Sequence, residues 1–242
     1  MISALSVDRS FSSPNHGERV GGGPIDHLVL HYTGMRTEEG ARDWLCNPVA
    51  QVSSHYVVYE DGRIFQLVDE ARRAWHAGRS FWRGVTDLNS RSIGIEICNP
   101  GHEFGYRPFP DRQIAVVLEL CRDILARHAI PPHQVVAHSD IAPTRKDDPG
   151  EFFPWDVCAK SGIGLWAPEA VEGELADLPE FLRLCGEIGF GIHHEDTDST
   201  SVIRAFQRHW RMSRVDGHLD AITMATARRV HALFPPFQTV AG

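Results

Sequence analysis

The residues best suited to chemistry lie in one polar loop, His138 to Gly150, which has the sequence HSDIAPTRKDDPG. His138 ends an apolar stretch, and the loop that follows can return the carboxylate of Asp148 to its side. His31 ends an earlier apolar stretch and supplies a second imidazole. Two histidines and one carboxylate form a catalytic zinc pattern, in which one coordination position stays open for water. For either motif alone, the alternative is a buried histidine beside carboxylates that cap turns.

Short apolar strands must position these residues. Five stretches have the pattern of strands: Ile25–Tyr32, Tyr56–Tyr59, Ile64–Val68, Ser92–Ile97 and Gln134–His138. The second and third are predicted to form a hairpin around the turn Glu60-Asp61-Gly62. Apolar residues at helical spacing predict a long amphipathic helix over Asp111–Ala129. Strands that alternate with helices predict an α/β fold with a mixed central β-sheet flanked by helices.

The chain divides at changes in composition. Residues 1–24 end in a Gly-Gly-Pro breaker and predict a loosely attached N-terminal arm, followed by a catalytic domain over residues 25–166. The acidic segment 167–177 suits a linker. Helical spacing over Leu178–Ile188, Thr200–Trp210 and Thr223–Leu233 predicts a small C-terminal three-helix domain within residues 178–242.

Four motifs resemble the type 2 N-acetylmuramoyl-L-alanine amidases, the family shared with phage lysozyme-amidases and peptidoglycan recognition proteins. They are Ser53-Ser54-His55-Tyr56, Trp75-His76-Ala77-Gly78, Ser92-Ile93-Gly94-Ile95-Glu96 and the His138–Gly150 loop. The resemblance covers about residues 25–160 and is closest to the amidase D and recycling-amidase branch.

This resemblance implies hydrolysis of the amide bond between N-acetylmuramic acid, or its anhydro form, and L-alanine in peptidoglycan or muropeptides. It also implies that His31, His138 and Asp148 are Zn²⁺ ligands, that Glu96 is the catalytic carboxylate, and that Lys146 is its cationic partner.

The chemistry of these residues agrees with that assignment. Zinc lowers the pKa of bound water to about 7 and polarises the substrate carbonyl. Glu96 can take the water proton and pass it to the departing amine, and desolvation in its apolar strand would raise its pKa towards a useful value. Lys146 would stabilise the developing oxyanion. The alternatives are an outward-facing strand charge for Glu96 and a solvent-exposed Lys146. The phage and recognition-protein branch has a tyrosine where this chain has Ser54, which leaves Glu96 as the base.

Other aromatic and histidine residues give weaker signals. His27 lies four residues before His31 on the same strand face, which makes it the main rival ligand, and we assign it a structural role. We expect His55 and His76 to line the substrate cleft, with Trp75 stacking on a sugar or peptide. Core packing is an equally fair interpretation of Trp75.

Residues 178–233 resemble the three-helix peptidoglycan-binding domain. The resemblance depends on Arg204-Ala205-Phe206-Gln207-Arg208 and on Val215-Asp216-Gly217-His218-Leu219-Asp220, whereas the usual Gly-Pro before the last helix is Asp220-Ala221 here. The alternative is a structural bundle packed on the catalytic domain.

Composition narrows the partners and the compartment. A net charge of −8 over 242 residues argues against nucleic acid, which normally requires a clustered cationic face. The chain contains no apolar run of the roughly 20 residues that a bilayer span needs. Because no secretory signal is visible, we expect a cytoplasmic protein. We also expect it to be a monomer. The cell envelope is the alternative, by resemblance to amidase D.

Two other functions are compatible with the same candidate metal ligands and catalytic residues. A non-catalytic peptidoglycan-recognition protein would keep the fold, but such proteins usually lose a metal ligand, and all of them are present here. A zinc peptidase that cuts the stem peptide is distinguished from an amidase only by the family resemblance.

Overall fold

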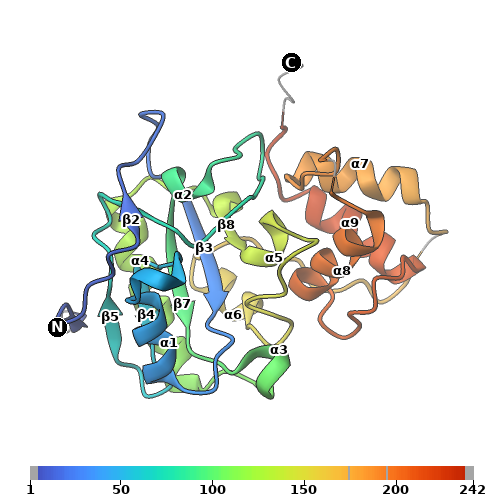
Figure 1. The fold of residues 1–242 in the computed structure, drawn as a ribbon. Coiled ribbons are helices and arrows are strands. Elements are labelled where there is room, and N and C mark those ends of the chain that lie inside the picture. Colours follow the sequence, from blue (N-terminus) through green and yellow to red (C-terminus); the bar gives the residue numbers. More distant parts are fainter. Residues whose placement is uncertain (1–4, 174, 195, 238–242) are drawn as a thin grey trace.

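A six-stranded mixed sheet forms the centre of the computed structural model, which describes residues 5–173, 175–194 and 196–237 (Figure 1). The strand order is β1-β5-β4-β7-β3-β8. The strands are β1 (Val7–Asp8), β3 (His27–Tyr32), β4 (Tyr56–Val58), β5 (Ile64–Gln66), β7 (Ser92–Ile97) and β8 (Val135–Ala137). Among the described pairs of this sheet, only the β4–β5 hairpin is antiparallel. The predicted α/β class with a mixed central sheet is therefore confirmed.

The parallel register of the central strands brings the chemically interesting residues to one edge of the sheet. His31 of β3 lies opposite Glu96 of β7, and Leu30 of β3 lies opposite Ala137 of β8. His138 follows Ala137 directly. Since parallel strands end at the same edge, His31, Glu96 and His138 meet there.

Side-chain alternation gives the two faces of the sheet different roles. Leu28 and Leu30 of β3 pack into the same apolar cluster as Val117 and Cys121 of helix α4 (Asp111–Arg127). Val29, on the opposite face, packs in a cluster with the C-terminal helices. His31 shares the face of Val29, because side chains two residues apart along a strand point the same way.

The remaining elements are short and lie around the sheet. They are β2 (His16–Gly17), β6 (Arg73–Ala74), α1 (Glu38–Leu45), η1 (Pro48–Ala50), α2 (Leu88–Arg91), α3 (Gly101–Phe104), η2 (Pro132–Gln134), α5 (His138–Ile141), α6 (Trp155–Lys160), α7 (Leu178–Ile188), α8 (Ser199–Trp210) and α9 (Ala221–His231). Among the described residues, no helix is both long and apolar enough to cross a membrane.

Residues 5–24 are part of the domain, so for these described residues the expectation of a loosely attached arm is wrong. β1 extends the sheet by pairing with β5, and β2 pairs with β6. The guanidinium of Arg19 donates hydrogen bonds of 2.8–3.0 Å to the carbonyls of Glu70, Ser90 and Ser92. These bonds join the segment to the loop after β5, to α2 and to the start of β7.

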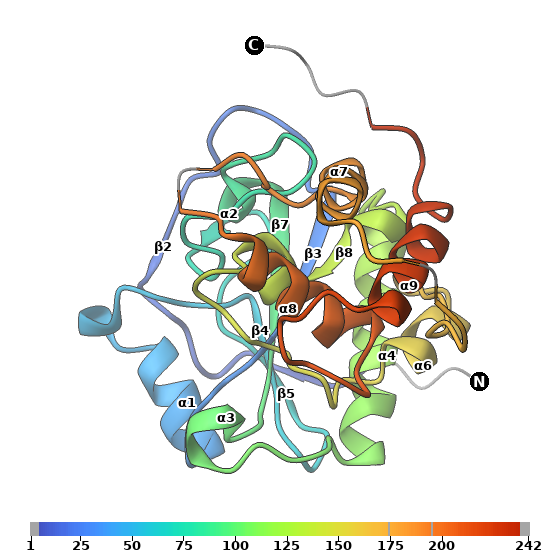
Figure 2. The same cartoon turned by 90° about the vertical axis from the view of Figure 1, so that its right-hand side faces the viewer.

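The C-terminal helices α7, α8 and α9 form a bundle that packs on the sheet face opposite α4 (Figure 2). Phe206 and Trp210 of α8 share one apolar cluster with Val136 of β8 and Ile141 of α5. The segment expected to be a linker also packs against the bundle: Ala170 is buried, and its amide donates to Thr226 Oγ1 at 3.0 Å. The bundle is therefore fixed on the catalytic half by a shared core, and the start of segment 167–177 does not behave as a free linker.

We predict that Arg19→Met lowers the free energy of unfolding by about 1–3 kcal/mol, because enclosed carbonyls lose their donor. Urea denaturation measures this difference. Arg9→Met is the matched control, since among the described residues exposed Arg9 bonds only to the Gln66 side chain, and it should change stability by less than about 0.5 kcal/mol. Equal losses in the two variants would contradict the role given to Arg19.

Candidate active site

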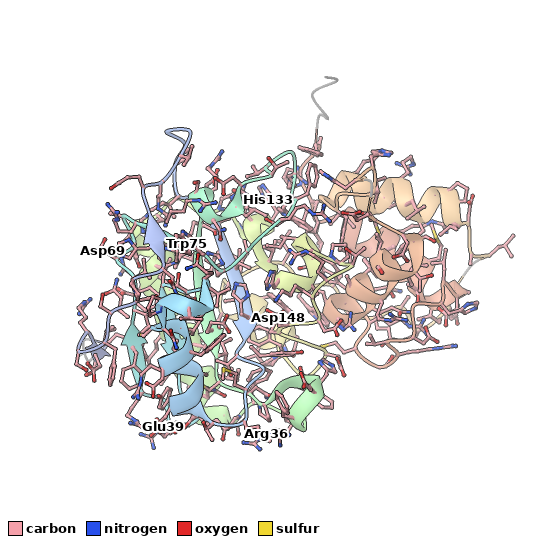
Figure 3. The ribbon with its side chains drawn as sticks, viewed as in Figure 1. Arg36, Glu39, Asp69, Trp75, His133 and Asp148 are labelled. Carbon is pink, nitrogen blue, oxygen red and sulfur yellow. The ribbon has the colours of Figure 1, made fainter. Side chains whose placement is uncertain are left out.

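Three potential ligand atoms converge at the C-terminal edge of the central strands. His31 Nδ1 lies 2.9 Å from His138 Nδ1 and 2.9 Å from Asp148 Oδ2, and His138 Nδ1 lies 3.0 Å from the same carboxylate oxygen. All three residues are buried. Asp148 lies beside the end of β3, on the side that faces the bundle (Figure 3). The amide of Ser139 donates to the carbonyl of Asp148 at 2.9 Å, which holds the two ends of the ligand loop together.

The outer hydrogen bonds of both imidazoles leave their Nδ1 lone pairs free to ligate. His138 Nε2 donates to the carbonyl of Ala77 at 3.2 Å, and His31 Nε2 donates to His76 Nδ1 at 3.0 Å. His76 Nε2 can then donate to Ser92 Oγ at 3.1 Å. This tautomer assignment follows from the network. A hydrogen bond from the ring nitrogen that does not bind the metal orients a metal-binding histidine. His31, His138 and Asp148 therefore fit a metal ion.

The protonation states also suit a cation. Burial, and then repulsion from His138, lowers the pKa of His31 to about 4, so its imidazole is neutral near pH 7. Burial alone would raise the pKa of Asp148, but His138 and His31, when they carry a proton on Nδ1, outweigh burial through charge and hydrogen bonding and hold that pKa well below its usual range. A neutral imidazole and an ionised carboxylate are the forms that bind metal.

Glu96 and Lys146 lie in the same cleft as the ligands. Burial, and then the charge of Asp148, raises the pKa of Glu96 well above its usual value, whereas Lys146 lowers it. The Oε2 atom of Glu96 accepts no hydrogen bond from any described residue. A carboxylate with a raised pKa and a free oxygen is suited to proton transfer.

The cleft has a volume of about 550 Å³ and opens beside the three ligands. Its lining includes Trp44, Val52, Trp75, His76, His102 and Arg145. Trp75 and His76 thus lie where the sequence placed them, and His76 also supports the ring of His31.

The expectation that His55 lines the cleft is wrong. Its side chain is fully buried beneath His76, where Nδ1 accepts a hydrogen bond from the Gly94 amide at 3.0 Å and Nε2 donates to the carbonyl of Arg72. Burial, and then the charge of Arg19, lowers the pKa of His55 to about 3. His55 is a neutral structural residue.

The rival ligand His27 lies away from the three converging atoms. Its Nδ1 bonds to Asp26 at 2.6 Å and its ring is buried, which agrees with a structural role.

Sequence reasoning missed three contributors to the site. The carbonyl of Ala77 and the hydroxyl of Ser92 orient the imidazoles, and Arg145 lines the cleft while its guanidinium donates to Ala77 and Arg79 carbonyls. All three residues lie inside the sequence motifs that resemble the amidase family, and their place in these motifs was the signal that could have found them.

Comparison with known proteins gives one consistent family. The profile of the N-acetylmuramoyl-L-alanine amidase family (Amidase_2) matches residues 21–151. The chain is 42% identical to N-acetylmuramoyl-L-alanine amidase AmiD of Escherichia coli, over 84% of this chain and 81% of AmiD. It is 32% identical to 1,6-anhydro-N-acetylmuramyl-L-alanine amidase AmpD of Haemophilus influenzae, over 63% of this chain and 90% of AmpD.

Solved structures agree with the sequence relatives. E. coli AmiD in complex with the substrate anhydro-N-acetylmuramic acid-L-Ala-D-γ-Glu-L-Lys matches with a TM-score of 0.79 and 38% identity, over 89% of this chain and 92% of that one. AmpDh3 from Pseudomonas aeruginosa, in complex with anhydromuramic pentapeptide, matches with a TM-score of 0.77 and 30% identity, over 96% and 99%.

We predict that the metal-free protein loses stability as the pH falls from 6.5 to 5. The pKa values of His31, His55 and His76 are lowered in the folded state, so the unfolded chain binds more protons below pH 6.5. Each histidine contributes a slope of up to about 1.4 kcal/mol per pH unit. The raised pKa of Glu96 acts in the opposite direction.

Urea denaturation at several pH values measures this slope, and the Glu96→Gln variant removes the opposing titration. We expect the free energy of unfolding to fall more steeply with decreasing pH in Glu96→Gln than in the wild-type chain. A free energy of unfolding that stays constant in both proteins between pH 6.5 and 5 would rule out neutral buried histidines.

Proposed function

The chain belongs to the N-acetylmuramoyl-L-alanine amidase family, and we propose that it hydrolyses the muramoyl-L-alanine amide bond with one zinc ion held by His31, His138 and Asp148. The observation that carries the metal assignment is the convergence of three buried ligand atoms, 2.9–3.0 Å apart. This separation lets one cation of zinc's size contact all three atoms. Zinc accepts two imidazoles and a carboxylate in catalytic sites.

When bound, zinc would supply a water of pKa near 7 and polarise the substrate carbonyl. Glu96 takes the proton from the attacking water, and its desolvated position favours accepting that proton near neutral pH. The same carboxyl group then returns the proton to the L-alanine amine as the bond to the carbonyl carbon breaks. Glu96 is thus base first and acid second.

Lys146 is proposed to stabilise the negative charge that develops on the carbonyl oxygen. It lines the cleft and forms no ion pair with any described carboxylate, so its ammonium is available to substrate. A positioned cation in a partly enclosed site is a strong source of oxyanion stabilisation. Trp75 offers a ring for a sugar or peptide.

The substrate class is peptidoglycan fragments in which muramic acid, or its anhydro form, carries a stem peptide. Solved structures of two relatives, AmiD and AmpDh3, hold anhydromuramyl peptides. An anhydromuramyl tripeptide is therefore the first substrate to assay. A non-catalytic recognition role is disfavoured because Glu96 and Lys146 share one cleft with the ligands His138 and Asp148.

A peptidoglycan-binding role for residues 178–242 stays a prediction based on the Arg204–Arg208 and Val215–Asp220 motifs. The bundle shares its core with Val136 and Ile141. It would therefore present any glycan strand at a fixed position relative to the cleft.

We predict that the full chain binds one zinc ion and that His138→Ala and Asp148→Ala lose it, because each removes one of three ligands. A chelator should abolish hydrolysis of anhydromuramyl tripeptide, and added Zn²⁺ should restore it. Metal content by mass spectrometry is the measurement. His27→Asn is the control, since it removes the rival imidazole and should keep one zinc. Unchanged zinc content in both ligand variants would contradict the site.

We predict that Glu96→Gln keeps its zinc and its fold but loses about 10²–10⁴-fold in kcat, because proton transfer is removed. Release of L-alanine-terminated peptide measures turnover. Glu39→Gln, a change of the same kind at an exposed residue of helix α1, should retain near wild-type kcat. If Glu96→Gln turned over substrate at a similar rate, another group would have to be the base.

A further inference from the structure

Helix α8 of the bundle contacts the metal-ligand loop through His209 and through Arg208. In Figures 1 and 2, α8 lies beside α5, the short helix that begins with His138. His209, in the last turn of α8, reaches Asp140 of α5, and its neighbour Arg208 reaches Asp147. Asp140 is two residues after one ligand, and Asp147 is one residue before another.

The contact between His209 and Asp140 is buried and directional. His209 Nδ1 donates to Asp140 Oδ2 at 2.7 Å, and both side chains are at most 3% exposed. The same carboxylate oxygen accepts from the Ala137 amide at 2.8 Å. Asp140 therefore joins α8 to the start of α5, where the backbone sets the position of His138.

Aromatic stacking fixes the ring of His209. It lies between the rings of Trp155 and Trp210, with centroids 3.8 and 3.7 Å away. The Nε2 atom has no hydrogen-bond partner among the described residues. The stacking and the single Nδ1 bond thus hold the ring, and its polar contact is with Asp140.

The second contact fixes the other end of the loop. Arg208 is 9% exposed along its side chain and pairs with Asp147 Oδ1 at 2.6 Å, next to the ligand Asp148. The bond from the Ser139 amide to the Asp148 carbonyl closes the loop between these points. Both protein ligands that belong to the loop are therefore supported from one turn of α8.

We propose that α8 is a positioning element for the metal centre, acting through His209 on Asp140 and through Arg208 on Asp147. This inference depends on the proposed zinc site. Outer contacts that orient ligands typically change metal affinity by about 10–100-fold when they are removed. His209 and Arg208 are positioning residues, since neither belongs to the ligand set.

The test compares metal affinity in three histidine variants of the full chain. His209→Leu removes the donor to Asp140 and should weaken Zn²⁺ binding about 10-fold or more. His209→Asn places an amide donor near the position of Nδ1 and should recover part of that loss. His231→Leu is the matched control, because it breaks another histidine–carboxylate pair of the bundle, with Glu187, away from the loop. It should bind zinc as the wild-type chain does.

Competition with a chromophoric chelator measures the zinc affinity, and the absorption spectrum of the Co²⁺-substituted protein reports ligand geometry. A general loss of stability would not move the Co²⁺ bands or be rescued by asparagine, whereas a displaced His138 would shift them. Circular dichroism establishes that each variant is folded.

If His209→Leu does not fold, Arg208→Met tests the positioning role instead. The side chain of Asp147, the partner of Arg208, is half-exposed, so the substitution leaves no buried unpaired charge. It should weaken zinc binding severalfold. Affinity within twofold of wild type in every folded variant at positions 208 and 209 overturns the positioning role. A wild-type chain that binds no zinc overturns the proposed function itself, which separates the two failures.

Discussion

The buried carboxylate of Asp148, facing two imidazoles, is the constraint on which the rest of the site depends. A charge removed from water costs several kcal/mol unless hydrogen bonds or opposite charges offset the loss. His31 and His138 point Nδ1 at it from 2.9 and 3.0 Å, but with their protons on Nε2 these atoms present lone pairs and do not offset the charge. Three polar atoms that crowd together in this way are best satisfied by a cation, because it interacts favourably with all of them at once.

The sheet satisfies this constraint through its register. Parallel pairing of β3 with β7 puts His31 opposite Glu96, so the proposed base lies beside the ligands without a separate loop to carry it. Gly94 permits the arrangement, since a Cβ at that position would lie 2.6 Å from the ring of His76. The His76 ring can then rest on β7 and accept the hydrogen bond from His31. The absence of a side chain at Gly94 therefore allows the contact with His76 that fixes the tautomer of His31.

The sequence predicted those parts of the molecule that depend on local pattern. The strand over Ser92–Ile97 and the helix over Leu178–Ile188 appear with the predicted bounds, because alternation and helical spacing report which side chains are buried. The loop after His138 was recognisable because several residues able to do chemistry follow one another there in a short, characteristic order. Trp75 and His76 were placed at the cleft by the motif that contains them.

The errors concern contacts between distant segments, which composition does not report. The Gly-Gly-Pro breaker indicated a loose arm, yet Arg19 is fixed by carbonyls more than fifty residues away. The acidic segment 167–177 suggested a linker, but Glu169 pairs with Arg211 and Ser213 across the bundle. His55 belongs to a cleft motif, yet its position under Gly94 depends on strand pairing that only the fold reveals.

The packing of the bundle changes how its contribution should be understood. A module on a flexible linker acts by raising the local concentration of the catalytic site on a polymer. A bundle that shares a core with β8 and α5 cannot move independently in that way, because separation would expose Phe206, Trp210 and Ile141 together. Besides any glycan that it binds, the bundle can act through fixed contacts, and the contacts nearest to the chemistry are those of α8 with the ligand loop. The catalytic half and the bundle are thus two parts of one folded unit, in which the helices that cover the sheet also hold the loop that carries His138 and Asp148.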